Sequence, residues 1–196
     1  YNILVVLDPR FTRRIGRCSR MTTEETMEII EKVRQFVEDE CKKPTSKYGY
    51  EPYRCHFVFV VKYSQDLARE LGADEEIVTL AGWLHDIGAI MVARKDHHIT
   101  GAEIARKKLE EFGCPSEKID RVVDCILNHR GSVPKERNTI EEQIIAEADT
   151  ISAFDDIVNL FDVALVWEKL SRSESKKSVR TKLENKWKQL KFEKSK

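Results

Sequence analysis

The element GWLHDIGA, residues 82–89, ends an apolar helical segment with two residues that could do chemistry. Trp83 and Leu84 belong to a segment that suits a core, yet His85 and Asp86 follow directly in its last turn. Burying an unpaired carboxylate costs several kcal/mol or more, so this placement of Asp86 requires a partner of opposite charge.

The histidines of the chain are few and lie on segments with helical spacing. There are five of them: His56, His85, His97, His98 and His129. Asp149 lies on another such segment, flanked on its face by Ala146 and Ala153, where small side chains leave room for a ligand. Imidazole and carboxylate ligands suit Zn, Mn, Fe, Co or Ni. The plain alternative is that each of these residues is a hydrogen-bonded core or rim residue.

In combination, these residues resemble a known family. The order His56, His85-Asp86, Asp149 is similar to the H…HD…D signature of the HD-domain metal-dependent phosphohydrolase superfamily, in which HDIG is a common spelling of the central motif. The segments HHITGAEIA and ILNHR resemble the two further histidine elements of members that hold two metals. The resemblance covers roughly residues 53–160.

The resemblance implies a set of metal ligands and a cofactor. The ligands would be His56, His85, Asp86, His98, His129 and Asp149. His98 enters this set because it lies three residues before Gly101 in an HxxGA element, and we expect its neighbour His97 to point away. Asp86 would also be catalytic and would bridge two metals if two bind. The cofactor would be one or two divalent ions among Mn, Fe, Zn, Co, Ni and Mg, with identity and number open.

Two departures from the family pattern bear on the substrate. Many members carry a phosphate-binding lysine directly after HDIG, whereas this chain has Ala89. The Tyr-Pro element that follows the late histidine in cyclic-dinucleotide phosphodiesterases of the HD-GYP type is missing from the sequence, which disfavours that substrate. For substrate binding we expect Arg130, whose forked donors can grip a phosphate, and Lys95, with Lys135 and Arg137 as weaker candidates. Plain surface charge is the alternative for each of them.

Three functions compete on these residues. The first is a metal-dependent phosphohydrolase, which uses a metal-activated water on a phosphate mono- or diester of a small metabolite or nucleotide. The second is a non-catalytic, metal-binding regulatory module, which the complete ligand set disfavours. The third is a di-iron oxygenase-type enzyme on a related helical scaffold. Iron content with oxygen consumption would single out the third function, and phosphate release would single out the first.

Helical spacing extends over nearly the whole chain and predicts an all-α, single-domain helical bundle. A Thr22-x-x-Glu25 capping box starts the first helix, and glycines at 72, 113 and 131 end later ones. A long helix is expected from about Ile140 to Leu170. We divide the chain into an N-terminal extended arm (1–21), an HD-type helical domain (22–170) and a C-terminal amphipathic helix packed on that domain (171–196).

Composition restricts the class of partner. The 196 residues hold 34 Lys and Arg against 34 Asp and Glu, and this balance gives no reason to expect nucleic acid or a membrane surface. The expected partner is therefore a small phosphorylated substrate, while the oligomeric state stays open. Five cysteines without a CxxC pair suit free thiols in a reducing compartment, and no apolar run approaches the roughly 20 residues of a membrane helix. We therefore expect a cytoplasmic protein.

Overall fold

The computed structural model describes residues 21–46, 48–131 and 136–195. Within these ranges the regular elements are all helical and no strand occurs, so the predicted all-α class is confirmed. Nearly all of the expected N-terminal arm, and Lys135 among the candidate phosphate ligands, lie outside the described residues. The division of the chain into three parts stays a prediction.

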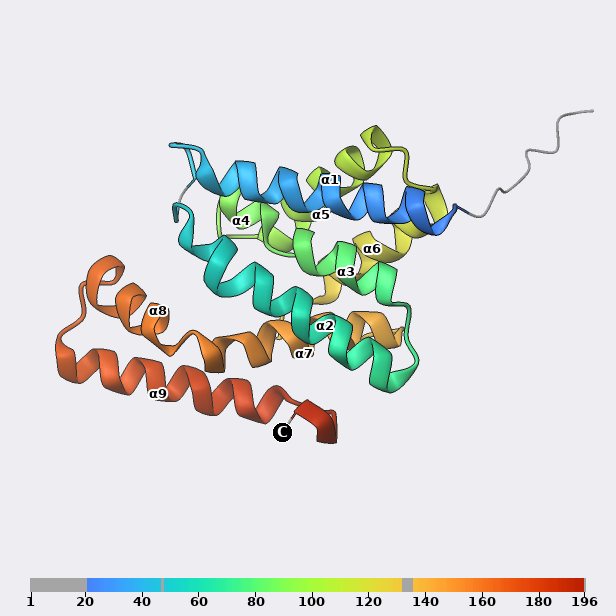
Figure 1. The fold of residues 1–196 in the computed structure, drawn as a ribbon. Helices are drawn as coiled ribbons and strands as arrows, with labels where there is room; N and C mark the ends of the chain where they lie inside the picture. Colours follow the sequence, from blue (N-terminus) through green and yellow to red (C-terminus); the bar gives the residue numbers. More distant parts are fainter. Residues whose placement is uncertain (1–20, 47, 132–135, 196) are drawn as a thin grey trace, which may run out of the picture.

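Figure 1 shows how the helices are arranged. Most of them are ordinary α-helices, and two five-residue turns are π-helical. In chain order the elements are α1 (Thr23–Lys42), η2 (π-helical, Tyr53–Phe57), α2 (Val58–Leu71), α3 (Glu75–Leu84), α4 (Ile87–Met91), α5 (His97–Glu111), α6 (Ser116–Asn128), α7 (Ile140–Asp155), α8 (Ile157–Asp162), η3 (π-helical, Val163–Trp167), α9 (Arg172–Gln189) and the short 3₁₀ turn η4 (Glu193–Ser195).

Local sequence signals set several helix ends. At the start of α1, the Thr22 hydroxyl accepts the Glu25 N–H at 3.2 Å and the Glu25 carboxylate accepts the Thr22 N–H at 2.7 Å, which confirms the capping box. Gly72 ends α2 with a φ of 69°, a left-handed conformation that favours glycine. The Asp74 side chain then accepts the N–H of Ile77 and caps α3.

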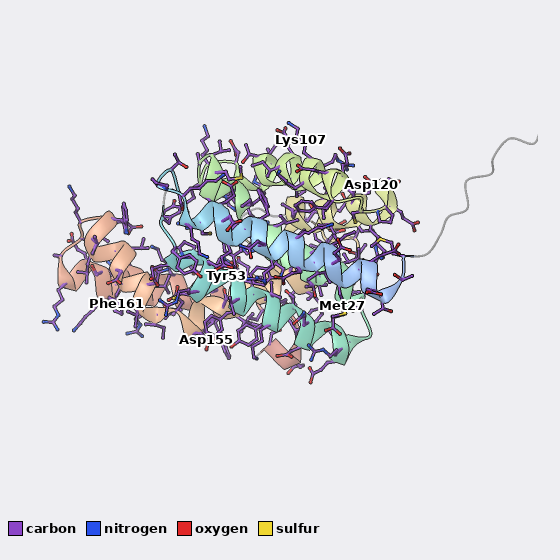
Figure 2. The ribbon with its side chains drawn as sticks, turned by 45° about the horizontal axis from the view of Figure 1, so that its top comes forward. Met27, Tyr53, Lys107, Asp120, Asp155 and Phe161 are labelled. Carbon is purple, nitrogen blue, oxygen red and sulfur yellow. The ribbon has the colours of Figure 1, made fainter. Side chains whose placement is uncertain are left out.

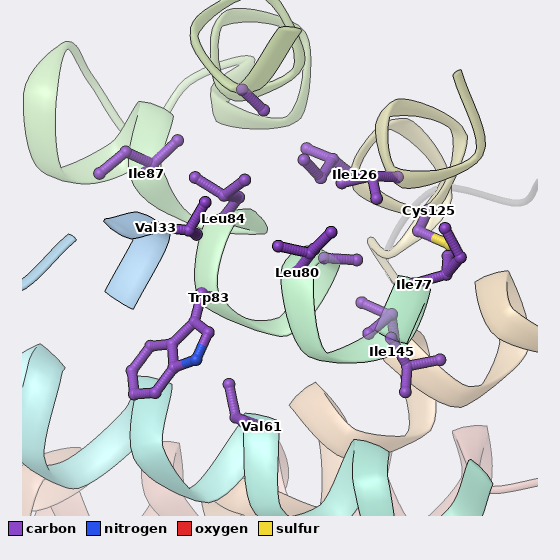
Figure 3. Packing of buried hydrophobic residues seen from close by; sticks show 14 of the residues in the cluster. Val33, Val61, Ile77, Leu80, Trp83, Leu84, Ile87, Cys125, Ile126 and Ile145 are labelled. Carbon is purple, nitrogen blue, oxygen red and sulfur yellow. The ribbon is translucent and has the colours of Figure 1, made fainter. Parts of the chain in front are cut away.

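The core is built around α3, which is buried on all sides. Every residue from Ile77 to Leu84 is buried, and α3 packs against α1, α2, α6 and α7. Figure 1 shows α3 between α1 and α2, and Figure 3 shows Trp83 pointing toward Val61 of α2. A helix that is apolar all round requires such an enclosed position. The end of α3, where the histidine–aspartate pair follows, is therefore held from several sides.

The long helix expected from Ile140 to Leu170 is interrupted, which corrects that prediction. The break is at Asp156, whose φ of −107° and ψ of 40° are not helical. Its carboxylate accepts the side-chain amide of Asn159 at 2.8 Å, an interaction that stabilises the bend before α8. Apolar spacing does not detect a single non-helical residue, and for that reason the sequence pattern missed it.

The C-terminal helix α9 packs against α7, α8 and η3, and Figure 1 shows it running beneath them. Val179 and Leu190 are buried on its inner side. Beyond the end of α9, the buried carboxylate of Glu147 on α7 accepts the backbone N–H of Lys191 at 2.5 Å and that of Phe192 at 3.4 Å. This carboxylate therefore fixes the C-terminal segment to the body of the protein.

Charged side chains cover the outside of the bundle. Figure 2 shows Lys107 of α5 and Asp120 of α6 on the outer surface, and both residues are exposed. Across the described residues, the helices are all too short or too polar to cross a membrane.

Candidate metal centre

Two groups of possible metal ligands meet just beyond the end of α3, and Asp86 belongs to both. The first group consists of His56, His85 and Asp86, and the second of Asp86, His97 and His129. Within each group the ligand atoms lie within 4.8 Å of one another. Asp86 therefore occupies the position between two adjoining sites.

The first group is compact and has Asp149 beside it. The Nε2 atoms of His56 and His85 are 2.9 Å apart, and Asp86 Oδ2 lies 3.6 Å from the former and 3.9 Å from the latter. Asp149 Oδ1 lies 3.6 Å from His56 Nε2. Two imidazole nitrogens and one carboxylate oxygen thus lie within 4.8 Å of one another, and a second carboxylate oxygen lies beside His56.

The second group uses the other oxygen of Asp86. Asp86 Oδ1 lies 3.0 Å from His97 Nε2 and 3.5 Å from His129 Nε2, and these two nitrogens are 3.2 Å apart. Since Oδ2 faces the first group and Oδ1 the second, a single carboxylate presents one oxygen to each site.

Hydrogen bonds on the far side of each ring fix the protonation of the imidazoles. A backbone carbonyl can only accept, so a ring whose Nδ1 faces a carbonyl carries its proton there and has a lone pair on Nε2. Three rings have such a contact: His85 Nδ1 with Gly82 O at 2.8 Å, His97 Nδ1 with Arg94 O at 2.8 Å, and His129 Nδ1 with Ile126 O at 2.6 Å.

His56 has the same arrangement through a hydroxyl. The Ser152 hydroxyl donates to the backbone carbonyl of Asp149 at 2.9 Å, and its oxygen is therefore free to accept from His56 Nδ1 at 3.1 Å. All four neutral rings consequently turn an Nε2 lone pair inward. Such hydrogen bonds from the outer nitrogen are the usual support of metal-bound histidines.

These contacts fit a bound cation. Lone pairs that face each other at 2.9 and 3.2 Å repel, and a positive charge between them turns the repulsion into attraction. Asp86 Oδ1 is buried, and while these rings are neutral with the proton on Nδ1 it receives no hydrogen bond from the described residues. A divalent metal at each group would satisfy both the nitrogens and this oxygen, and a mixed nitrogen and carboxylate donor set suits Zn, Mn, Fe, Co or Ni.

Separate elements bring the ligands together. His56 comes from the π-helical turn η2, a conformation that occurs often at functional sites. His85 and Asp86 link α3 to α4, His129 directly follows α6, and Asp149 lies on α7. Because the buried helix α3 contacts α2, α6 and α7, the core fixes the separation of these ligands.

A close approach of two glycines positions the remaining ligand, His97. A Cβ placed on Gly88 of α4 would lie 2.3 Å from the His97 carbonyl oxygen and 2.6 Å from the Gly101 nitrogen. A Cβ on Gly101 would lie 3.3 Å from the Gly88 nitrogen. The first turn of α5 therefore rests directly on α4, next to Asp86.

The two adjacent histidines lie in different surroundings in the structure. His97, which we expected to point away, belongs to the second group, whereas His98 belongs to neither group. The ring of His98 instead lies 3.4 Å from the guanidinium of Arg130. A signal for this was present in the sequence: His97 precedes Gly101 by four residues, so both lie on the face of α5 that approaches α4.

Burial and the carboxylates shift the pKa of the imidazoles in opposite directions. Burial lowers the pKa of His85 to about 4, so its ring is neutral at pH 7. Burial acts most strongly and would lower the pKa of His56 and His97, but the hydrogen bond to Asp86 and the nearby carboxylate charges together outweigh it and raise both values. When no cation lies between the groups, the carboxylates therefore favour the protonated form of these two rings.

The carboxylates remain ionised in this surrounding. Burial acts to raise the pKa of Asp86, yet the neighbouring rings hold it well below its usual range. The same opposition applies to Asp149, whose pKa falls to about 2 because the Lys186 ammonium and the rings of His56 and His85 outweigh burial. Both groups are thus available as anionic ligands at neutral pH.

A pocket of about 390 Å³ opens onto these ligands. Its lining includes His56, Asp86, His97, His129 and Asp149. Three cationic side chains also line it, namely Arg94, Arg130 and Lys186.

The expected phosphate-binding residues separate in the structure. Arg130 lines the pocket, in the position that the sequence suggested. Lys95 is exposed and is not part of this lining, whereas its neighbour Arg94 is. Lys186, which the sequence did not single out, lies 3.8 Å from Asp149 Oδ2.

Arg137 has a structural role instead of a place in the pocket lining. Its Nε donates to the carbonyl of Asn128 at 3.0 Å, and Nη2 lies 3.4 Å from the carbonyl of His129 and 3.5 Å from that of Arg130. Asn128 is the last residue of α6 and the other two directly follow it, so these carbonyls lack partners within the helix. Arg137 therefore holds the helix end that carries His129.

Comparisons with known proteins find similarity over the segment that contains these ligands. Residues 53–153, just over half of the chain, match the family model of the HD domain. The chain is 32% identical to the tRNA (cytidine(56)-2'-O)-methyltransferase of Picrophilus torridus over 122 residues, which cover 54% of this chain and 33% of that protein. It is 40% identical to ribonuclease Y of Lactobacillus acidophilus over 100 residues, covering 50% of this chain and 17% of that protein. The chain thus spans about a third or less of the length of these relatives.

One solved structure is also similar, a protein of an uncultured Thermotogales bacterium described as a predicted HD superfamily hydrolase. It shares 18% sequence identity, with a TM-score of 0.46 over 85% of each chain.

Proposed function

The chain belongs to the HD-domain family, and on this premise we propose that it is a metal-dependent phosphohydrolase that cleaves a phosphate mono- or diester of a small metabolite or nucleotide. The observation that carries the proposal is the orientation of the Asp86 carboxylate, which turns one oxygen toward each of the two histidine groups. Sites with two metals about 3.5–4 Å apart are typical of phosphatases and nucleases.

The pocket would hold two divalent ions. His56, His85 and Asp149 would hold one, His97 and His129 the other, and Asp86 would bridge them. Bound there, the ions would lower the pKa of a water toward about 7 and polarise a phosphoryl oxygen.

The protein's own residues would prepare the reaction in two ways. The outer hydrogen bonds of the four rings keep each imidazole in one tautomer and orientation, so that little reorganisation is needed. Arg130, which lines the pocket beside His98, can hold a phosphate through its planar, forked donors.

The alternative functions differ in what they require. A regulatory module without catalysis would bind metal and phosphate ligands but would release no product. A di-iron redox enzyme would consume oxygen in the presence of iron. Neither alternative accounts better for three cationic side chains around one pocket, because cations there favour an anionic substrate.

A metal and substrate screen tests the proposal. The purified protein is loaded separately with Mn, Fe, Co, Ni, Zn and Mg and assayed for phosphate release from nucleotides, sugar phosphates and aryl phosphates. Two of the relatives are ribonucleases or act on tRNA by name, so a short oligoribonucleotide belongs in the panel although we expect no nucleic-acid partner. Release with at least one metal, lost in Asp86→Ala, supports the proposal. Oxygen uptake with iron and no hydrolysis with any metal would refute it.

A further inference from the structure

The pocket extends beyond the segment that matches the HD-domain family. That segment ends at residue 153, whereas α8, η3 and α9 begin after it. These three elements nonetheless contribute several pocket-lining residues: Asn159, Leu160, Val163, Trp167, Lys186 and Gln189. One wall of the pocket is therefore formed by residues that follow the segment matching the family model.

Lys186 is the cation of this wall. It lies on the side of α9 that faces Asp149, and its ammonium donates to the Asp149 carbonyl at 3.3 Å with Oδ2 of the same residue at 3.8 Å. The side chain is 27% exposed, so a ligand in the pocket can reach it. An ammonium has three donors, and a single backbone carbonyl does not exhaust them.

Ala89 shows why a cation from α9 matters. It lines the same pocket, directly after the HDIG element, and offers only a methyl group. Positive charge for an anionic ligand must therefore come from elsewhere in the lining, and Lys186 is the lysine among these residues. It stands next to Asp149, close to the first histidine group.

The same wall has an apolar part with an aromatic ring. Leu160, Val163 and Trp167 line the pocket, and Trp167 is 63% exposed although it is the largest of the three. An exposed indole at the edge of a ligand pocket offers a flat surface on which a ring can stack. A polyhydroxylated sugar would gain less from this surface than a planar ring.

We propose that α8, η3 and α9 form the substrate-selecting wall of the pocket, in which Lys186 contacts the phosphate and Trp167 stacks on a planar group of the same substrate. The substrate class that follows is a phosphate ester of an aromatic or heteroaromatic alcohol or nucleoside. This inference rests on the proposed function, since it concerns the substrate of that site.

The test uses two substrates and two substitutions in the full chain with metal bound. Phenyl phosphate carries a ring, and glycerol 1-phosphate does not. Lys186→Met is expected to lower kcat/KM for both substrates by roughly 10- to 100-fold, mostly through KM, because a charge-assisted contact with phosphate is lost. Trp167→Ala is expected to lower it roughly 3- to 10-fold for phenyl phosphate alone, because only that substrate stacks.

A binding measurement separates these roles from a general effect on folding or on the metal. Inorganic phosphate is titrated into each metal-loaded protein by calorimetry, and metal content is measured in parallel. Lys186→Met should weaken phosphate binding roughly tenfold or more at unchanged metal content, and Lys186→Arg should restore part of it. If Lys186→Met does not fold, Lys186→Gln keeps a donor to the Asp149 carbonyl without the charge and takes its place.

Matched controls lie on the same helix. Lys188→Met and Trp187→Ala change exposed residues of α9 that are not part of the pocket lining. Both should leave kcat/KM for the two substrates and the affinity for inorganic phosphate unchanged. Unaltered phosphate affinity and kcat/KM in Lys186→Met would overturn the assignment of Lys186. Equal losses for both substrates in Trp167→Ala would overturn that of Trp167. A wild-type protein that hydrolyses nothing, yet binds phosphate through Lys186, would refute the proposed function while supporting the wall's role in binding phosphate.

Discussion

Asp86 is the residue on which both histidine groups depend, because its two oxygens face different groups. His56, His85, His97 and His129 each belong to a single group, and Asp149 lies beside the first. The consequences of substitution should therefore differ by position in a way that a purely structural role would not produce.

Metal content after single substitutions tests this directly. Asp86→Ala should lose metal from both sites, and His97→Ala should reduce the content from about two ions to about one. His98→Ala is the matched control, since its ring is adjacent in sequence but outside both groups. Elemental analysis of the purified variants gives the counts. A loss of metal in His98→Ala with none in His97→Ala would contradict the geometry.

Metal binding should weaken in mildly acidic solution. The pKa values of His56 and His97 are raised above 6.5, so below that range protons compete with the metal for both rings. His85, with a pKa of about 4, stays neutral and competes only at much lower pH. Metal release measured between pH 8 and pH 4 should therefore begin well above the pH at which His85 titrates. A constant affinity down to pH 5 would be inconsistent with protonated His56 and His97.

At the level of elements, the crossing of α4 and α5 decides which histidine reaches Asp86. The crossing is tight at Gly88, where a Cβ would meet backbone atoms of residues 97 and 101. Backbone atoms cannot move aside as a flexible side chain can, so these two helices require glycine at this position.

Gly88→Ala should separate α4 from α5 and lose the second metal. The free energy of unfolding should decrease by about 1–3 kcal/mol, the usual cost of inserting a methyl group into a packed interior. Gly101→Ala should be milder, because its Cβ would lie 3.3 Å from the nearest atom instead of 2.3 Å. Thermal unfolding and metal analysis of both variants check the order, and a Gly88→Ala protein as stable as wild type would contradict it.

For the whole molecule, the docking of α9 completes the pocket. The buried Glu147 carboxylate anchors the residues that follow α9, and Lys186 lies one turn earlier on the same segment. A change far from the histidines should therefore alter the pocket through the position of α9.

Glu147→Ala should loosen this end of α9. It leaves the N–H groups of Lys191 and Phe192 without their acceptor, and we expect a loss of about 1–3 kcal/mol in the free energy of unfolding. Hydrogen exchange should rise in the last turns of α9 while α3 stays protected. Glu184→Ala, which breaks only an exposed ion pair with Arg180, is the control and should cost under about 1 kcal/mol. Equal exchange in both variants would argue against the anchor.

Buried thiols offer a probe of the global unfolding reaction. Burial raises the pKa of Cys41 to about 12 and that of Cys114 to about 11, and only the thiolate reacts with alkylating agents. At pH 8 both thiols should thus stay unmodified in the native protein and react at the rate of global opening. Mass spectrometry after iodoacetamide treatment locates the label, and rapid labelling of Cys41 without denaturant would show that α1 opens locally.

Local features of this protein could be predicted from the amino-acid sequence alone. Helix ends depend on hydrogen bonds and backbone angles that involve only a few neighbouring residues, as at Thr22 with Glu25, at Gly72 and at Asp74. The order of histidines and carboxylates on successive helices was equally visible, because ligand chemistry depends on residue type. These signals were sufficient for the all-α class and for the family.

Which side chains share the pocket could be seen only in the tertiary structure. His97 and His98 point about 100° apart on one helix, and the choice between them depends on how α5 crosses α4. Lys186 is one of several lysines on a basic helix, and nothing near it in the sequence distinguishes it from Lys188. Its contact with Asp149, 37 residues away, arises from the docking of α9 on α7. Such contacts depend on packing between distant segments, which local periodicity does not encode.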